Sequence, residues 1–140
     1  MAYEHIFTPL QVGSLTLENR ILLPPMVTFG LSGADGNVTQ DVIRHYAARA
    51  RGGAGLLIVE ATCVHPNGKL TEHQLGLWDD AQIEGHQMLT DAVHAFDRPV
   101  LVQLHHAGGK AVGDVRVSAS AYEDHGRTAR AMTERDVQAC

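Results

Sequence analysis

The chain has 140 residues, of which 44% are hydrophobic and 19% charged, and its formal net charge is −5. This composition is typical of a globular protein, and the length allows one domain with its own core. The acidic balance argues against a nucleic-acid surface, which requires clustered Lys and Arg. Two cysteines without CxxC spacing, an N-terminus without a signal-peptide pattern and apolar runs far shorter than a membrane span predict a cytoplasmic protein.

The first part of the chain predicts a small hairpin, a buried strand and a helix, in that order. Apolar residues alternate on both sides of Gly13 and Ser14, which is a turn signal. Residues 20–25 form a compact apolar run ended by two prolines, a pattern typical of a buried parallel strand. Thr39 is the expected N-cap of a helix that the glycines at 52–53 end.

Two more strands and another helix follow. Residues 55–61 form a second continuous apolar strand, and a polar loop separates it from the next helix. Asp79 and Gln82 have the spacing of a capping box at the start of that helix, and residues 97–99 break it, since Pro99 cannot continue a helix. Residues 100–104 are the third predicted strand.

The last part of the chain predicts a long polar loop rich in glycine and then the start of a third helix, with Thr133 as its N-cap. The sequence stops about two turns into this helix, and a helix that short is marginal unless it packs on something. We therefore expect the chain to be part of a longer protein; the alternative is a short C-terminal helix that is complete as it stands.

The order of elements predicts an α/β protein with a parallel sheet and right-handed crossovers. A doubly wound sheet and a partial TIM (β/α)8 barrel both fit, and the spacing alone does not separate them. No GxGxxG follows the first strand, which weakens a dinucleotide-binding doubly wound sheet. The chain is too short for a closed barrel, which needs roughly 200 residues or more.

In both architectures ligands bind at the carboxyl ends of the parallel strands. Pro25 and Met26 give one strand end a rigid backbone and a polarizable apolar surface. Ala61 leaves room for a flat ring, and the Gln103 amide offers donors and an acceptor to a heterocycle edge such as the pyrimidine side of a flavin. The alternative for each of these residues is a purely structural role.

His105 and His106 suggest a metal site as an alternative. Neighbours on a strand point to opposite faces, so their rings do not converge easily on one ion. No HExxH motif or acidic cluster accompanies them, so we predict no metal.

Four motifs in the same order resemble those of the old yellow enzyme family of NADH:flavin oxidoreductases and 2,4-dienoyl-CoA reductases. The resemblance covers nearly the whole chain. The first motif comprises residues 7–10, 13–21 and 25–26, and the other three are residues 51–62, 76–85 and 103–108.

This resemblance implies that residues 1–140 are the N-terminal part of a single FMN-binding barrel domain, a hairpin plus about three βα units. It implies FMN as cofactor, NAD(P)H as hydride donor and a small molecule with an activated C=C bond, such as an enone, enoate or enoyl thioester, as substrate. The positions that line the flavin in the family match Pro25, Met26, Val27, Ala61 and Gln103.

The chain departs from the family at three positions. Val27 replaces the usual Thr or Cys, Phe29 the frequent Tyr, and Gly109 the usual Arg. The family's substrate-activating pair, His-His or His-Asn, follows the fourth strand and is expected beyond residue 140, so no catalytic residue is assigned.

Two functions of different kinds stay open at this point. The first is an FMN-dependent reductase completed by further sequence or by a second chain. The second is a truncated, non-catalytic half-barrel or interaction module. A third and weaker reading is a metal-dependent barrel hydrolase using His105 or His106. Three parallel strands leave a raw sheet edge and apolar faces, so we expect the chain to need the rest of the barrel or to self-associate.

Overall fold

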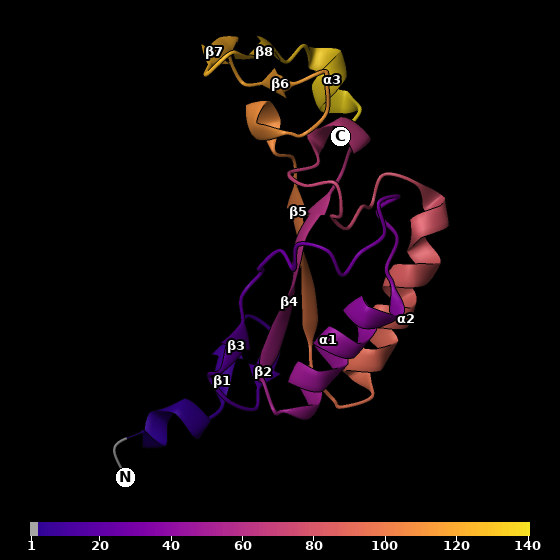
Figure 1. Ribbon diagram of the computed structural model, residues 1–140. Coiled ribbons are helices and arrows are strands. Elements are labelled where there is room, and N and C mark those ends of the chain that lie inside the picture. The colour runs from indigo at the N-terminus through magenta and orange to yellow at the C-terminus, as the bar shows by residue number, and fades with distance from the viewer. Residues whose placement is uncertain (1–2) are drawn as a thin grey trace.

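The computed structural model describes residues 3–140. Its centre is a parallel sheet in the order β3-β4-β5, with two helices against one face and a small sheet beyond one end (Figure 1). The helices are α1 (Gln40–Arg51), α2 (Ile83–His94) and α3 (Glu134–Gln138), with 3-10 turns at η1 (Glu4–Phe7), η2 (Pro66–Gly68), η3 (Asp80–Gln82) and η4 (Gly108–Lys110). The strands are β1 (Leu10–Val12), β2 (Leu15–Leu17), β3 (Leu22–Leu23), β4 (Leu56–Cys63), β5 (Val100–His105), β6 (Val117–Ser118), β7 (Tyr122–Asp124) and β8 (Arg127–Ala131).

The local signals for the hairpin and the helix starts are confirmed. β1 and β2 pair antiparallel, and the turn between them has Gly13 at φ 58°, a conformation that glycine adopts without strain. Thr39 caps α1 by accepting a hydrogen bond from the amide of Val42 at 3.3 Å. The predicted capping box of Asp79 and Gln82 is present, although it opens η3, which continues into α2.

Three expectations need correction. The first strand is not buried: β3 is two residues long and Leu22 is 49% exposed, because its free edge has no neighbour among the described residues. β4 continues to Cys63, beyond the predicted end of the strand. Helix α2 ends at His94, ahead of the predicted break at residues 97–99, within which Asp97 turns the chain at φ 55°.

The segment predicted as a long loop contains a second small sheet, in the order β6-β8-β7. β7 and β8 form a hairpin whose turn residues, His125 and Gly126, have φ angles of 48° and 74°. The two strands carry few apolar residues, so they show no alternating hydrophobic pattern. The only local signal was a glycine in a two-residue turn.

The hydrophobic core lies between the sheet and the helices α1 and α2 (Figure 1). Its buried members are Val42, Tyr46, Ala50, Leu57, Val59, Leu75, Leu89 and Val93. The other face of the sheet carries no helix in the described part of the chain, and Leu101 there is 55% exposed. One face of the sheet is therefore packed and the other presents apolar side chains to solvent.

Among the described residues, no helix has the length and apolar character needed to cross a membrane.

Candidate functional site

The predicted site residues lie at the carboxyl end of the central sheet. Val59 pairs with Val102 and Thr62 with Leu104, so the register shifts by one residue between these pairs. Glu60 and Ala61 therefore lie opposite the single residue Gln103, which is the two-against-one count of a β-bulge. Bulges of this kind are frequent next to active sites, where they re-aim side chains.

Side chains from three elements satisfy the backbone of this bulge. The amide of Glu60 donates to the Tyr46 hydroxyl oxygen of α1 at 2.7 Å. The Thr62 hydroxyl donates to the carbonyl of Glu60 at 2.9 Å, and the Gln74 side-chain amide donates to the carbonyl of Ala61 at 2.7 Å. Tyr46, Thr62 and Gln74 are all buried. Because buried polar groups must be paired, this set of bonds holds the bulge in one shape.

The Glu60 carboxylate ties the end of β3 to the bulge. It is completely buried and accepts hydrogen bonds from the amide of Thr28 and, at 3.2 Å, from the Thr28 hydroxyl. Burial raises the pKa of the Glu60 carboxyl above its ordinary value, although both bonds from Thr28 act in the opposite direction. Residues 25–28 are thus held next to the bulge on β4.

Glu60 was not assigned a role from the sequence, although a signal was present. It is the one charged residue in the apolar run of residues 55–61, and a carboxylate is rarely fully buried without partners. Tyr46 lies in the helix predicted after Thr39, and Gln74 lies in the polar loop predicted after residues 55–61. Neither carried a local pattern that points to β4.

The five predicted cofactor residues fall into two groups at this end of the sheet: Ala61 and Gln103 lie on β4 and β5, and Pro25, Met26 and Val27 follow β3. Ala61 is on the bulge and Gln103, which is exposed, lies opposite it. Met26 is 69% exposed, and with Val27 it lines a cavity of about 400 Å³ whose other wall is α1, including His45 and Arg49. That cavity lies on the helix side of the sheet and does not include Ala61 or Gln103.

The bulge fits the edge of a planar heterocycle better than it fits a metal ion. The exposed Gln103 amide supplies both donors and an acceptor, and Ala61 opposite it is 5% exposed and has no side-chain atom beyond Cβ. No group of three His, Cys, Asp or Glu residues in the described chain is arranged to hold a metal ion.

The neighbouring histidines have separate tasks. The Nδ1 atom of His105 lies 3.2 Å from the Gln74 side-chain nitrogen, while Nδ1 of His106 accepts from the amide of Gly108 at 3.0 Å. The His106 ring packs directly over Gly68, where any added Cβ atom would overlap it.

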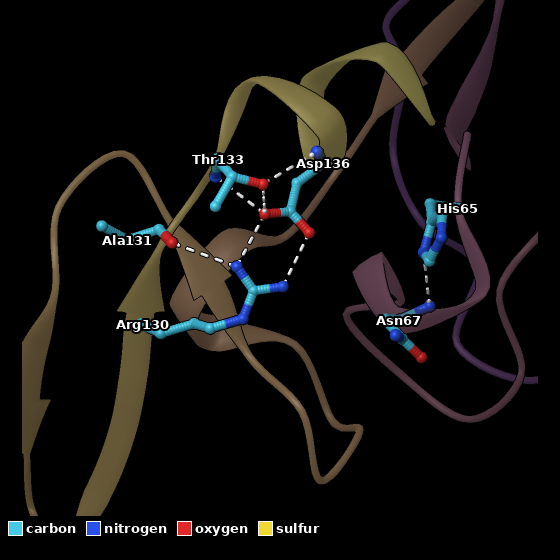
Figure 2. Close-up of polar contacts among 6 residues, drawn as sticks. All are labelled: His65, Asn67, Arg130, Ala131, Thr133 and Asp136. Atoms are coloured by element: carbon cyan, nitrogen blue, oxygen red, sulfur yellow. Dashed lines mark hydrogen bonds and ion pairs between the residues drawn. The ribbon is translucent and has the colours of Figure 1, made fainter.

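A second cavity of about 140 Å³ lies where α3 meets the loop after β4, lined by residues that include His65 and Arg130. Figure 2 shows the Asp136 carboxylate between Arg130 and Thr133, with His65 across from them. Arg130 makes two bonds of 2.6 Å to Asp136, and this guanidinium together with Thr133 holds the pKa of the Asp136 carboxyl well below its usual range. The Arg130 charge is therefore already neutralised by an internal partner.

Gly109, where the family usually has Arg, is explained by Tyr122. A Cβ atom at position 109 would overlap the phenol of Tyr122, which comes from β7. The ring of Tyr122 thus occupies the space next to the η4 backbone that any side chain at 109 would need. A third cavity, of about 360 Å³, is lined by both residues together with Lys110 and Arg127.

Restoring arginine at this position is expected to destabilise the protein. Gly109→Arg forces Tyr122 out of its place, and overpacking of this kind costs about 1–3 kcal/mol. Tyr122→Ala in the same chain should relieve most of that loss, which a double-mutant cycle by urea unfolding measures. Gly113→Arg is the matched control, because a Cβ there would lie 4.0 Å from the nearest atom. Additive effects of the two substitutions would contradict the assignment.

Comparison with known proteins places this geometry in a family. Residues 5–140 match the NADH:flavin oxidoreductase / NADH oxidase family. The chain is 37% identical over 141 residues to the NADPH dehydrogenase of Bacillus licheniformis, covering 99% of this chain and 42% of that protein. It is 39% identical over 136 residues to the NADPH dehydrogenase of Bacillus subtilis, covering 95% of this chain and 40% of that protein.

Among solved structures, the old yellow enzyme from Pichia sp. AKU4542 superposes with a TM-score of 0.86 at 26% identity, over 99% of this chain and 40% of that one. The β3-β4-β5 sheet with its helices is therefore a partial TIM (β/α)8 barrel and not a doubly wound sheet. The chain spans about 40% of the length of the curated relatives it matches. It belongs to the NADH:flavin oxidoreductase family of the old yellow enzymes and corresponds to the N-terminal part of their barrel.

Proposed function

We propose that residues 1–140 supply the first part of the FMN site of a reductase that takes hydride from NAD(P)H and reduces an activated C=C bond. The observation that carries the proposal is the supported bulge at Glu60 and Ala61 opposite the exposed amide of Gln103. Membership of the flavin oxidoreductase family supports FMN as the group that this arrangement holds.

Each predicted residue has a defined task in this proposal. The Gln103 amide bonds the pyrimidine edge and Ala61 admits the flat ring. Residues 25–27 contribute the backbone after β3, since the side chains of Met26 and Val27 line the cavity on the helix side. The Glu60 carboxylate keeps this segment next to β4 through Thr28. FMN, when bound, supplies the two-electron chemistry, and the chain supplies binding and orientation. The residues that polarise the substrate are expected outside residues 1–140.

A second candidate is a truncated half-barrel that does no chemistry and works as an interaction module; one chain of a split enzyme is the other alternative. The uncovered sheet face, with Leu22 49% and Leu101 55% exposed, favours an element that packs there. In either case we predict a reducing, cytoplasmic setting, since Cys63 and Cys140 are both free thiols.

A chimera tests the proposed function. The 140-residue chain replaces the matching 42% of the Bacillus licheniformis NADPH dehydrogenase, and FMN is quantified by visible absorbance and by release on denaturation. We expect about one FMN per chain and oxidation of NADPH in the presence of an enone.

Gln103→Ala in this chimera is expected to weaken FMN binding about tenfold, which corresponds to the loss of one good hydrogen bond. Gln87→Ala, an exposed glutamine on α2, is the matched control and should leave the Kd for FMN unchanged. A folded chimera without flavin, or equal affinity in the Gln103→Ala variant, would refute the proposed site. The 140-residue chain titrated with FMN alone shows whether it needs the rest of the barrel.

A further inference from the structure

Gln74 is a completely buried side chain that links β4 to β5 from the loop between η2 and α2. Its Oε1 atom accepts from the amide of Leu70 at 2.6 Å. Its Nε2 atom donates to the carbonyl of Ala61 at 2.7 Å and lies 3.2 Å from Nδ1 of His105. One amide therefore joins the bulge to the end of the strand that carries Gln103.

Two backbone groups fix the orientation of this amide. The Leu70 N–H can only donate, so it must face the amide oxygen of Gln74. The Ala61 carbonyl can only accept, so it must face the amide nitrogen. In the flipped orientation, the Gln74 amide N–H would face the Leu70 N–H, and the Gln74 amide oxygen would face the Ala61 carbonyl oxygen.

The orientation of the amide in turn fixes the proton on His105. The second N–H of Gln74 Nε2 meets Nδ1 of His105, so that ring atom must be an unprotonated acceptor. The neutral ring then carries its proton on Nε2. Burial also lowers the pKa of the His105 imidazole, and this likewise favours the neutral ring. The titratable group beside it is His106, whose pKa is lowered by burial and then by His65 and His105.

Building on the proposed function, we propose that Gln74 is a positioning residue of the FMN site, which holds the Ala61 carbonyl of the bulge and keeps His105 as a neutral imidazole protonated on Nε2. His105 lies two residues beyond Gln103 on the same strand. It can therefore offer an N–H donor, but no acceptor at Nε2, to a group that reaches this strand end. Carbonyl, carboxylate and phosphate oxygens suit such a donor.

The tautomer is measured on the 140-residue chain without flavin, by nitrogen-15 NMR of the imidazole rings across a pH titration. We expect Nδ1 of His105 to show the shift of an acceptor and Nε2 that of a protonated nitrogen. Gln74→Glu keeps the shape of the side chain, and its ionised carboxylate cannot donate. It should therefore move the proton to Nδ1 and raise the protonated-to-neutral ratio of His105 about tenfold or more at a given pH. Gln74→Met, which removes the amide donor and the amide acceptor without adding a charge, should raise that ratio less.

His106 is the internal control, because its Nδ1 is held by the amide of Gly108 and not by Gln74. A wild-type His105 protonated on Nδ1, or a titration that Gln74→Glu leaves unchanged, would overturn the inference. In the chimera, Gln74→Glu is expected to weaken FMN binding about tenfold, as loss of a positioned hydrogen bond does. Unchanged FMN affinity in a chimera that binds flavin would also overturn the positioning role. Absence of FMN from the wild-type chimera would refute the proposed function instead, and the NMR result would still decide the tautomer.

Discussion

Glu60→Ala is expected to lower the free energy of unfolding by about 2–4 kcal/mol and to release residues 25–28 from the bulge. The substitution leaves the amide of Thr28 without its acceptor and opens a cavity in a fully buried position. Urea unfolding measures the loss. Thr28→Ser, which keeps the amide and a hydroxyl, is the matched control and should cost less than 1 kcal/mol. A loss of similar size in both variants would mean that the carboxylate is not the clamp.

Glu60→Gln separates the shape of this side chain from its charge. Because the folded pKa of Glu60 is raised, its contribution to stability is fully present below the unfolded value of about 4.3 and is lost as pH rises through the folded pKa. The difference in unfolding free energy between the wild type and Glu60→Gln should therefore change in favour of the glutamine variant as pH rises from about 4.5 to 8. A difference that does not vary with pH would contradict a raised pKa.

The parts of the fold that the sequence predicted are those governed by local chemistry. The sequence identified three N-caps, Thr39, Asp79 and Thr133, because a hydroxyl or carboxylate just before a helical segment accepts hydrogen bonds from the first free backbone amides of the helix. All three residues cap helices in the structure. The parallel strands were predicted because continuous apolar runs suit strands with both faces covered. Here one face of those strands is open, which was expected from the small number of strands and not from the apolar runs themselves.

The site shows the opposite limit, because its geometry depends on register. Nothing local to residues 55–61 or 100–104 indicates that two residues of one strand would oppose one of the other. Ala61 and Gln103 were singled out from their place at predicted strand ends and from the family resemblance, neither of which predicts the register. Tyr46 and Gln74, which support the bulge, become visible only when α1 and a polar loop are folded against β4. A side chain that supports a strand from a distant segment produces no periodic pattern in the sequence.

A charged substitution on the open face of the sheet should have different effects on folding in the 140-residue chain and in the complete barrel. Leu101 pairs in register with Ile58, which lies between Leu57 and Val59 on β4. The side chains of Leu57 and Val59 pack against the helices, so the side chains of Ile58 and Leu101 point to the opposite face of the sheet. In the 140-residue chain, Leu101→Lys should keep its ammonium hydrated and reduce self-association without a measurable loss of stability. Sedimentation velocity and urea unfolding measure the two quantities.

In the chimera the same substitution should abolish folding and flavin content. The interior of a closed (β/α)8 barrel is filled by layers of side chains, and an unpaired ammonium there costs several kcal/mol. Val115→Lys, at a residue that is 54% exposed in the segment before β6, is the matched control and should be tolerated in both proteins. A Leu101→Lys chimera that folds and binds FMN would mean that Leu101 does not face the barrel interior. A destabilised Leu101→Lys variant of the 140-residue chain would instead mean that its sheet face is already covered by self-association. The two results together distinguish a surface that is buried only in the complete barrel from an interface between copies of this chain.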